Sequence, residues 1–441
     1  MNYCETMEVL TKIRKQRGSV PGLEGVRELA RRLKDPQDHI GTVHIAGTNG
    51  KGSVGAEVAS ALKEAGYRVG RFSSPAVFDY LEQFQINGNN LEQEKFAAVM
   101  TEVEHCCREM EEEGLPHPTA FEMEAVAAWM IFLREHCDCA VIESGMGGTL
   151  DATNIVKQPL VSVITSVSMD HMGMLGDSLQ EIAANKAGII KAGCPVVTVR
   201  QHPDAMGVIE QTAKEKGCEL TVAELSEAAN VIVDREGCAF QYPKARSRQY
   251  DLPLSGTFQV ENAVCAIETL NVLKRRLSGS IYLLNDEVIR KGLEQARCPG
   301  RLERIGEYPD FVLDGAHNRG AAARLRETLD SVRRHEPSVY IFGVLKDKEY
   351  EEIIRIMFSK KDRIYTVTPQ NDRGLDGAVL AEKIRAAGFQ ANYCPDMDQA
   401  VEQAVEAAGS TGCVLAFGSL SYLQDIRAAY QRYAERKRDR K

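Results

Sequence analysis

The sequence predicts an α/β protein, and three observations carry this prediction. Short apolar segments that are typical of strands alternate with longer segments whose apolar residues recur at helical spacing. A glycine-rich stretch at residues 47–53, with the sequence GTNGKGS, separates a segment of the first kind from one of the second. A further series of strands and helices follows a break at residues 298–301. This order is typical of largely parallel sheets covered by helices.

The glycine-rich stretch predicts a phosphate-binding loop, because it follows a strand at 43–46 and opens a helix. Glycines let the backbone approach a phosphate, and the N–H groups at the helix start point toward the anion. We expect Lys51 to reach the terminal phosphates and Ser53 to contact a phosphate or a metal. The general Walker pattern is incomplete, since Ile45 replaces its first glycine and the hydroxyl comes two residues after the lysine. The alternative is therefore a glycine-rich turn without a ligand.

Composition restricts the class of protein. The chain has 441 residues, enough for two or three domains, and a net charge of −9, which argues against a nucleic-acid binder driven by phosphate neutralisation. No apolar run is long enough to cross a bilayer, and the first residues lack the pattern of a secretory leader. The twelve cysteines include no C-x-x-C pair. We therefore expect reduced thiols in a cytoplasmic protein rather than a zinc site or a disulfide framework.

Elements before and after the loop follow in order. Helices are expected within 5–34, interrupted at 18–25, then a strand at 67–72, helices at 92–113 and 122–136, and a strand at 139–143. Parallel strands end at one edge of the sheet, where α/β proteins place their ligands. Ser74 and Glu143 follow two such ends, so we expect Glu143 to serve a magnesium ion. The alternatives are a simple turn serine and a carboxylate that caps the next turn.

The rest of the chain completes the first domain and forms a second one. A strand at 161–167 precedes His171, which is a candidate metal or phosphate contact, although a single histidine is more often structural. Residues 218–255 are expected to be β-rich, and a helix is expected to begin at Asn262. Strands at 311–314, 339–344, 363–367 and 414–417 alternate with helices. We predict a phosphate-loop NTPase-like domain at 1–298 and a smaller Rossmann-like α/β domain at 299–441.

Many short motifs give the chain a family resemblance over nearly its whole length. They are GTNGKGS at 47–53, SP at 74–75, QING at 85–88, FE at 121–122, GG at 147–148, DATN at 151–154, DH at 170–171, KAGI at 186–189, FQ at 258–259, NA at 262–263, PGR at 299–301, DGAHN at 314–318, Gly343, and DK at 347–348. In this order they resemble the folylpolyglutamate synthases of the Mur ligase superfamily. Bacterial members often act also as dihydrofolate synthases.

The resemblance implies a role for each matched position. It implies ATP contacts at Gly50, Lys51, Gly52, Ser53, Asn262, Arg301 and Asp314. It implies ligands for magnesium, at two metal positions, in Ser74, Glu143 and His171. It implies a pterin-binding pocket lined by Thr119, Phe121, Glu122, Leu150, Asp151 and Ala152. It implies catalytic roles for Lys51, Lys186 and His317, with Lys186 carbamylated; an ion pair or phosphate contact is the plain alternative for Lys186.

The implied reaction is ATP-dependent ligation of L-glutamate to reduced folates, and also to dihydropteroate, through an acyl phosphate. The resemblance suggests a monomer, with no nucleic-acid or membrane partner. Three positions depart from the family pattern: Ala76 and Gln83 stand where histidine and arginine are common, and Thr149 replaces an arginine. The implied pterin preference can differ accordingly.

Three alternatives compete with this interpretation. A Mur ligase of cell-wall synthesis would share the loop, but usually has threonine or serine directly after the lysine, where this chain has Gly52. A monofunctional polyglutamate synthase is not separable from a bifunctional enzyme by sequence. A non-catalytic nucleotide-binding protein would not need Lys51, Glu143, His171 and Lys186 together. Polyglutamate length and oligomeric state are left open.

Overall fold

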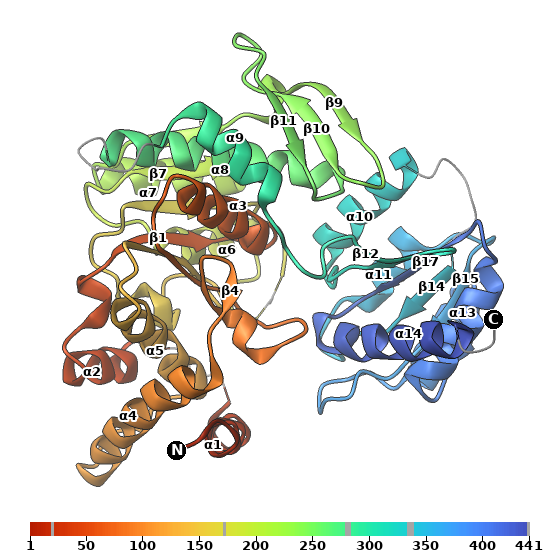
Figure 1. The fold of residues 1–441 in the computed structure, drawn as a ribbon, viewed down its shortest axis with the longest axis horizontal. Coiled ribbons are helices and arrows are strands. Elements are labelled where there is room, and N and C mark those ends of the chain that lie inside the picture. Colours follow the sequence, from red (N-terminus) through yellow and green to blue (C-terminus); the bar gives the residue numbers. More distant parts are fainter. Residues whose placement is uncertain (19–21, 171–172, 278–283, 333–338, 439–441) are drawn as a thin grey trace. The chain divides into compact units, whose positions relative to one another are not determined.

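The computed structural model describes residues 1–441 except 19–21, 171–172, 278–283, 333–338 and 439–441 (Figure 1). The chain forms two compact units, and each has a mixed but mainly parallel sheet, which confirms the predicted α/β class. The first unit comprises 1–231, 240–252 and 260–297; the second comprises 232–239, 253–259 and 298–441. Two short segments before residue 298 thus pack with the second unit, and the proposed domain boundary at 298/299 stays a prediction.

The first unit contains an eight-stranded sheet in the order β4-β3-β2-β5-β1-β6-β7-β8. Its strands are β1 (Gly41–Ala46), β2 (Val69–Phe72), β3 (Phe84–Ile86), β4 (Asn89–Asn90), β5 (Cys139–Glu143), β6 (Val161–Ile164), β7 (Val196–Val199) and β8 (Leu220–Ala223). All neighbours from β2 to β8 are parallel, whereas β3 and β4 are antiparallel additions at one edge. The ends of β1, β2, β5 and β6 therefore lie at one edge of the sheet.

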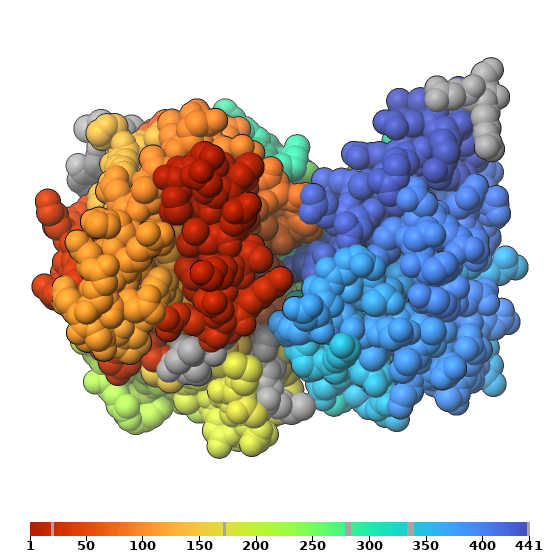
Figure 2. All heavy atoms as spheres, turned by 90° about the horizontal axis from the view of Figure 1, so that it is seen from below, coloured from red at the N-terminus to blue at the C-terminus, as the bar shows by residue number. Residues whose placement is uncertain are grey.

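Helices cover both faces of this sheet. They are α1 (Tyr3–Arg17), α2 (Glu24–Arg32), α3 (Lys51–Glu64), α4 (Gln93–Glu112), α5 (Ala120–Arg134), α6 (Leu179–Ala187), α7 (Pro203–Glu215), α8 (Thr257–Arg276) and α9 (Asp286–Gln295). Successive strand residues point to opposite faces. Gly55 of α3 lies against Arg71 and Val141, whereas Phe72 and Ile142 join the core beneath α5. Surfaces of α1 and α4 lie side by side in Figure 2.

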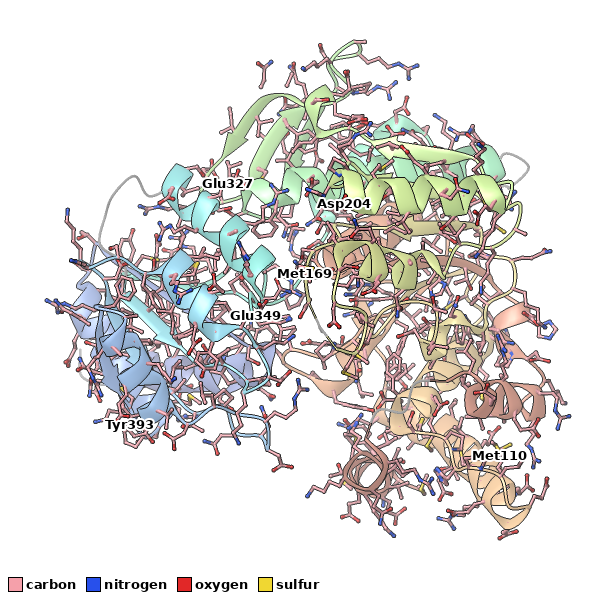
Figure 3. All side chains as sticks on the ribbon, turned by 180° about the vertical axis from the view of Figure 1, so that it is seen from behind. Met110, Met169, Asp204, Glu327, Glu349 and Tyr393 are labelled. Atoms are coloured by element: carbon pink, nitrogen blue, oxygen red, sulfur yellow. The ribbon has the colours of Figure 1, made fainter. Side chains whose placement is uncertain are left out.

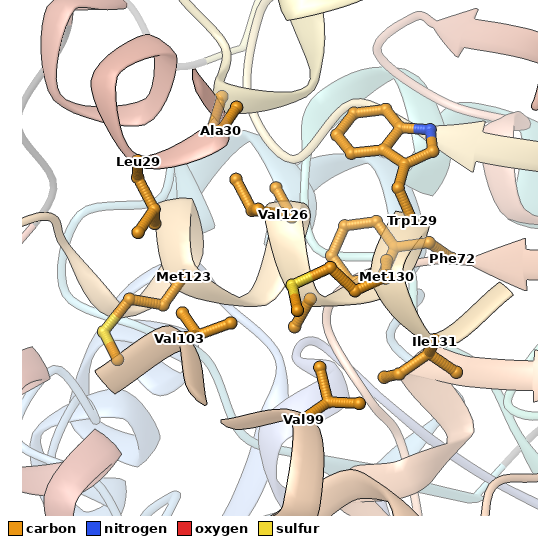
Figure 4. Packing of buried hydrophobic residues seen from close by; sticks show 14 of the residues in the cluster. Leu29, Ala30, Phe72, Val99, Val103, Met123, Val126, Trp129, Met130 and Ile131 are labelled. Carbon is orange, nitrogen blue, oxygen red and sulfur yellow. The ribbon is translucent and has the colours of Figure 1, made fainter. Parts of the chain in front are cut away.

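The largest core of the first unit lies between α5 and its neighbours. Figure 4 shows Trp129 and Met130 of α5 among side chains from α2, α4 and β2. Trp129 is fully buried, and its indole Nε1 donates to Thr42 Oγ1 at 3.4 Å. A buried indole N–H that has an acceptor avoids most of the desolvation cost. This core fixes the position of β5, whose last residue is Glu143.

The second unit contains a six-stranded sheet in the order β12-β13-β17-β14-β15-β16. Its strands are β12 (Glu303–Glu307), β13 (Asp310–Leu313), β14 (Val339–Phe342), β15 (Arg363–Thr366), β16 (Gln390–Tyr393) and β17 (Cys413–Phe417), and its helices are α10 (Arg319–Val332), α11 (Tyr350–Met357), α12 (Gly377–Ala386), α13 (Met397–Ala408) and α14 (Leu423–Arg438). Only β12 is antiparallel to its neighbour. Figure 3 labels Tyr393, which lies exposed on the edge strand β16.

The structure corrects two expected elements. The helix expected to begin at Asn262 begins at Thr257, directly after Gly256, because Val260 shares the buried face of the helix with Ala263 and Val264. The β-rich stretch divides: β8 completes the large sheet, and β9 (Ala229–Val233), β10 (Cys238–Gln241) and β11 (Gln249–Leu252) form a three-stranded sheet. All twelve cysteines are free thiols, as predicted. Among the described helices, none has the length and apolarity needed to cross a membrane.

One buried acid in the first unit leads to a stability prediction. Glu57 of α3 is fully buried, and neither carboxyl oxygen meets a hydrogen-bond donor in the described part of the chain. Burial raises its pKa well above the ordinary 4.5. An acid whose folded pKa is raised makes the folded state lose stability as the pH rises above the unfolded pKa.

We expect Glu57→Met, which keeps the volume and removes the acid, to stabilise the protein by about 1–3 kcal/mol at neutral pH. The gain in melting temperature over wild type should grow between about pH 5 and about pH 8. Scanning calorimetry of both proteins across this range measures it. The matched control is Glu64→Met, at a half-buried position at the end of the same helix, and a gain that does not change with pH would contradict the assignment.

Candidate active site

The glycine-rich loop joins β1 to α3 at the carboxyl edge of the large sheet. Gly50 precedes α3 with φ +90°, a conformation that favours glycine. A side chain there would also collide with Asn262 Oδ1 of α8. The loop is therefore close to Asn262, one of the residues expected to contact ATP. Because Lys51 begins α3, the N-terminus of this helix lies at the glycine-rich loop, and a helix N-terminus favours an anion.

The segment after β6 holds the loop in place. Thr48 N donates to Ser166 O at 2.8 Å, and Thr165 Oγ1 donates to Asn49 O at 2.7 Å. Ser168 N donates to Thr48 Oγ1 at 3.1 Å. These bonds come from a different strand end and fix the loop backbone before any phosphate binds. A binding site that is already ordered loses less entropy when its ligand arrives.

Lys51 lies beside the carboxylate predicted to serve magnesium. Its Nζ donates to Gly47 O at 3.1 Å and lies 3.8 Å from Oε1 of Glu143, the last residue of β5. Ser74 follows β2, two strands from β1, at the same edge. A carboxylate and a hydroxyl are ligands that magnesium accepts, with phosphate oxygens completing the shell. His171, the third predicted ligand, lies outside the described residues.

No group of three or more His, Cys, Asp or Glu side chains in the described ranges has the arrangement of a metal site. Magnesium in nucleotide-dependent enzymes commonly binds one or two protein oxygens together with substrate phosphates, and Glu143 and Ser74 offer such oxygens. The donors present therefore fit a magnesium ion that arrives with the nucleotide.

A second lysine also donates a hydrogen bond to the carbonyl of Gly47. Lys186, near the end of α6, is buried, and its Nζ donates to Gly47 O at 2.9 Å. Burial and then the charge of Lys51 lower its pKa to about 7, against the opposing effect of Asp170 and Asp151. Near neutral pH a large share of Lys186 is consequently an uncharged amine, which is the form that reacts with carbon dioxide.

The residues predicted to line a pterin pocket surround the loop after β5, residues 144–151, which we call the β5 loop. Thr119 and Glu122 form a capping box at the start of α5, where Thr119 N donates to Glu122 Oε2 at 2.7 Å. The ring of Phe121 covers Gly145, so close that no side chain would fit at that position. Leu150 is 49% exposed at the tip of the loop. Phe121 and Leu150 are apolar side chains of the kind that line ligand pockets.

The carboxylate of Asp151 accepts hydrogen bonds from residues in and next to the β5 loop. Its Oδ2 accepts from Met146 N at 2.8 Å, and its Oδ1 accepts from Thr153 N at 3.0 Å and Thr153 Oγ1 at 2.5 Å. Burial raises its pKa, and these donors partly oppose the shift. The carboxylate that the resemblance assigns to substrate binding therefore also orders the loop on which Leu150 lies, directly before Ala152.

The structure shows the hydrogen bonds at or near the three residues that depart from the family pattern. Thr149 Oγ1 donates to Asn185 O at 2.9 Å, which attaches the β5 loop to the helix that carries Lys186. Gln83 is 5% exposed and donates to Tyr80 O at 3.2 Å. Glu82 accepts from Val77 N and Phe78 N, both at 3.1 Å, and closes the turn that contains Ala76. Neither replaced arginine has a cationic substitute at its own position.

In the second unit, the predicted nucleotide contact Asp314 directly follows β13. Its Oδ1 accepts from Ala316 N at 2.8 Å and its Oδ2 from Leu302 N at 2.9 Å. Burial raises its pKa, while the charge of Arg301 opposes the rise. His317 Nδ1 lies 2.7 Å from Gly315 O, and since a carbonyl only accepts, Nδ1 carries a proton. The PGR and DGAHN motifs are thus brought together within this unit.

Some site residues were not singled out from the sequence. His44 in the middle of β1, and Ser144 and Thr153 around the β5 loop, form a buried polar cluster next to Asp151. The available signal was a histidine between Val43 and Ile45 in an otherwise apolar strand. Its partner Thr153 lies 109 positions away, so only the fold joins them.

The phosphate loop, its lysine and the strand-end carboxylate define a nucleotide-dependent enzyme of the phosphate-loop class. Family comparison is more specific: residues 45–270 match the Mur ligase middle domain, and residues 300–420 match the Mur ligase glutamate ligase domain. The chain belongs to the Mur ligase family, and its relatives place it with the folylpolyglutamate and dihydrofolate synthases, which are ATP-dependent ligases.

Relatives and solved structures match over nearly the full chain. The dihydrofolate synthase/folylpolyglutamate synthase of Bacillus subtilis is 35% identical, covering 93% of this chain and 95% of the relative. The folylpolyglutamate synthase of Lacticaseibacillus casei is 30% identical, covering 93% and 96%. The Mycobacterium tuberculosis folylpolyglutamate synthase with ADP and AMPPCP superposes with a TM-score of 0.85 at 27% identity, covering 98% of this chain and 99% of that one. E. coli FolC with DHPP and ADP gives 0.82 at 27%, covering 98% of each.

Proposed function

We propose that this protein ligates L-glutamate both to dihydropteroate and to reduced folates, with ATP as the energy source. The observation that supports the reaction is that Lys51 and Lys186 both donate to the phosphate-loop carbonyl Gly47 O, with Glu143 3.8 Å from Lys51. The full-length relative from Bacillus subtilis, which carries both activities in its name, supports the dual substrate range. We further propose that the protein acts as a cytoplasmic monomer.

ATP is needed because a carboxylate is a poor acyl donor. Transfer of the γ-phosphoryl group to a carboxylate oxygen of the pterin substrate releases ADP and forms an acyl phosphate. The amine of glutamate then attacks the acyl carbon, loses a proton, and expels phosphate as the amide forms. In this scheme the N–H groups of the loop and the ammonium of Lys51 bind the phosphates and stabilise negative charge as it moves.

Magnesium would be held by Glu143 and Ser74, with His171 proposed at a second ion. When bound, the ion neutralises charge on the phosphate oxygens. Lys51, whose Nζ lies 3.8 Å from Glu143 Oε1, would share this task.

Lys186 is proposed to act as a carbamate. The neutral amine attacks carbon dioxide, loses one proton, and becomes an anionic group. Its burial and the nearby charge of Lys51 support this assignment, because both favour the neutral amine. A carbamate would form an ion pair with Lys51, whereas the unmodified amine competes with it for Gly47 O.

The second unit is proposed to supply Arg301 and Asp314 for ATP and His317 for catalysis. Asp314 has both oxygens engaged by backbone donors, so it orders the turn at Gly315 as well. Thr119, Phe121, Glu122, Leu150, Asp151 and Ala152 are proposed to form the pterin pocket.

Product analysis tests the dual substrate range. The purified protein is incubated with ATP, magnesium and L-glutamate, separately with dihydropteroate and with a reduced folate, and the products are identified by mass spectrometry. We expect one added glutamate on dihydropteroate and one or more on the folate. Addition to the folate alone would show a monofunctional polyglutamate synthase, and would direct attention to Ala76, Gln83 and Thr149. No addition to either would overturn the proposal.

A further inference from the structure

His44 is an unusual residue for its position. It lies in the middle of β1, paired with β5 on one side and β6 on the other, and is fully buried. Its Nδ1 has no partner among the described residues, whereas an aliphatic side chain there would need none. Burying an unpaired polar atom costs free energy. The histidine therefore requires an explanation other than the packing of the sheet.

The other ring nitrogen faces two hydroxyls. Nε2 lies 2.9 Å from Thr153 Oγ1 and 3.3 Å from Ser144 Oγ, which flank the β5 loop at its two ends. Both hydroxyls are fully buried. Burial, and then the charge of Lys191, lower the pKa of His44 to about 3, so the imidazole is neutral at physiological pH.

The chemistry of the partners fixes the direction of these bonds. Asp151 Oδ1 accepts from the backbone N–H of Thr153 and lies 2.5 Å from Thr153 Oγ1. An acceptor at that distance takes the hydroxyl proton, so Thr153 Oγ1 is left to accept from the imidazole. The order of donation is His44 Nε2–H to Thr153 hydroxyl to Asp151 carboxylate. A strand of the sheet is thereby connected to the carboxylate at the end of the β5 loop.

We propose that His44, acting through the Thr153 hydroxyl, is a positioning residue that holds Asp151 and the β5 loop in the conformation that binds the pterin-bearing substrate. This inference rests on the proposed function, since it concerns the pocket of that reaction. His44 itself does not touch the substrate, because it is enclosed within the sheet. The phosphate loop begins at the end of the same strand but is held by the segment after β6, so binding of ATP should not depend on this connection.

The test separates binding of the two substrates. Thr153→Val keeps the shape and removes the hydroxyl, and Thr153→Ser restores it. We expect Thr153→Val to raise KM for the pterin substrate about 10-fold with KM for ATP unchanged, and Thr153→Ser to stay close to wild type. His44→Leu should behave as Thr153→Val, whereas His44→Gln, whose amide nitrogen can replace Nε2, should retain most of the affinity.

The double variant provides the decisive comparison. If His44 acts through Thr153, His44→Leu combined with Thr153→Val should be no weaker for the pterin than either change alone. Equal rises in both KM values, or an unchanged pterin KM in Thr153→Val, would overturn the inference. Should His44→Leu fail to fold, the Thr153→Val and Thr153→Ser pair still decides it, since these changes are small. A wild-type protein without pterin-dependent phosphate release would instead overturn the proposed function.

Discussion

Lys51→Met is expected to lower kcat for ligation by about 10²–10³-fold, the cost of removing one preorganised group that stabilises developing charge. Lys51 is the cation at the start of α3, and its ammonium lies between Gly47 O and Glu143 Oε1. Methionine keeps the length and the apolar stem, so the helix and the loop should keep their structure. Steady-state phosphate release with saturating substrates measures the loss.

The matched control is Lys63→Met, which removes an exposed lysine from the last turn of the same helix. It should leave kcat within about 2-fold of wild type, as expected for a surface charge. A Lys51→Met protein that keeps the activity of the control would show that the loop does not act on the phosphates.

Lys186→Ala is expected to lower kcat by at least about 10²-fold. Recovery of activity by added small molecules then distinguishes a carbamate from an ammonium. If the working group is anionic, a short carboxylate such as acetate or propionate should enter the vacated space and recover part of the activity. If it is the ammonium, a short alkylamine should do so instead. Initial rates of the variant with each additive measure the difference.

Lys191→Met serves as the control for loss of a partly buried lysine, because Lys191 also has a lowered pKa, to about 8, but donates to Asn154 O rather than to the phosphate loop. It should retain most of the activity and respond to neither additive. In wild type, removing dissolved carbon dioxide should lower the rate, and bicarbonate should restore it. Recovery of Lys186→Ala by amines alone would contradict the carbamate.

The parts of the fold that were predictable are those where burial determines the residue type. β1, β5 and β17 are apolar runs enclosed on both faces, and the helix starts carry recognisable caps, as at Thr119 and Ser178. Two of the strands that were not predicted lack this signal. β16 reads QANY with one buried residue, and β4 has only two exposed asparagines. Edge strands are stabilised by backbone pairing with a neighbour, which leaves little trace in their side chains.

The candidate active site also has parts that could be predicted from the sequence and parts that could not. Lys51 and Glu143 were predictable because motifs and strand ends place them, and the structure brings them together. The shared acceptor Gly47 O was not predictable, since it requires the position of α6 relative to the loop. Nor was the connection from His44 to Asp151, which joins β1 to a segment after β5 that is far away in sequence. Such pairings follow from topology, and sequence patterns describe only local structure.

The most direct test of the central claim is phosphate release from ATP, measured with each substrate omitted in turn. We predict release only when the pterin substrate, magnesium and L-glutamate are all present, with hydroxylamine in place of glutamate also supporting release and yielding a hydroxamate of the pterin substrate. That result is expected if the substrate carboxylate is converted to an acyl phosphate in the site that contains Lys51. Release that is independent of the pterin, or ATP binding without release under any of these conditions, would contradict it.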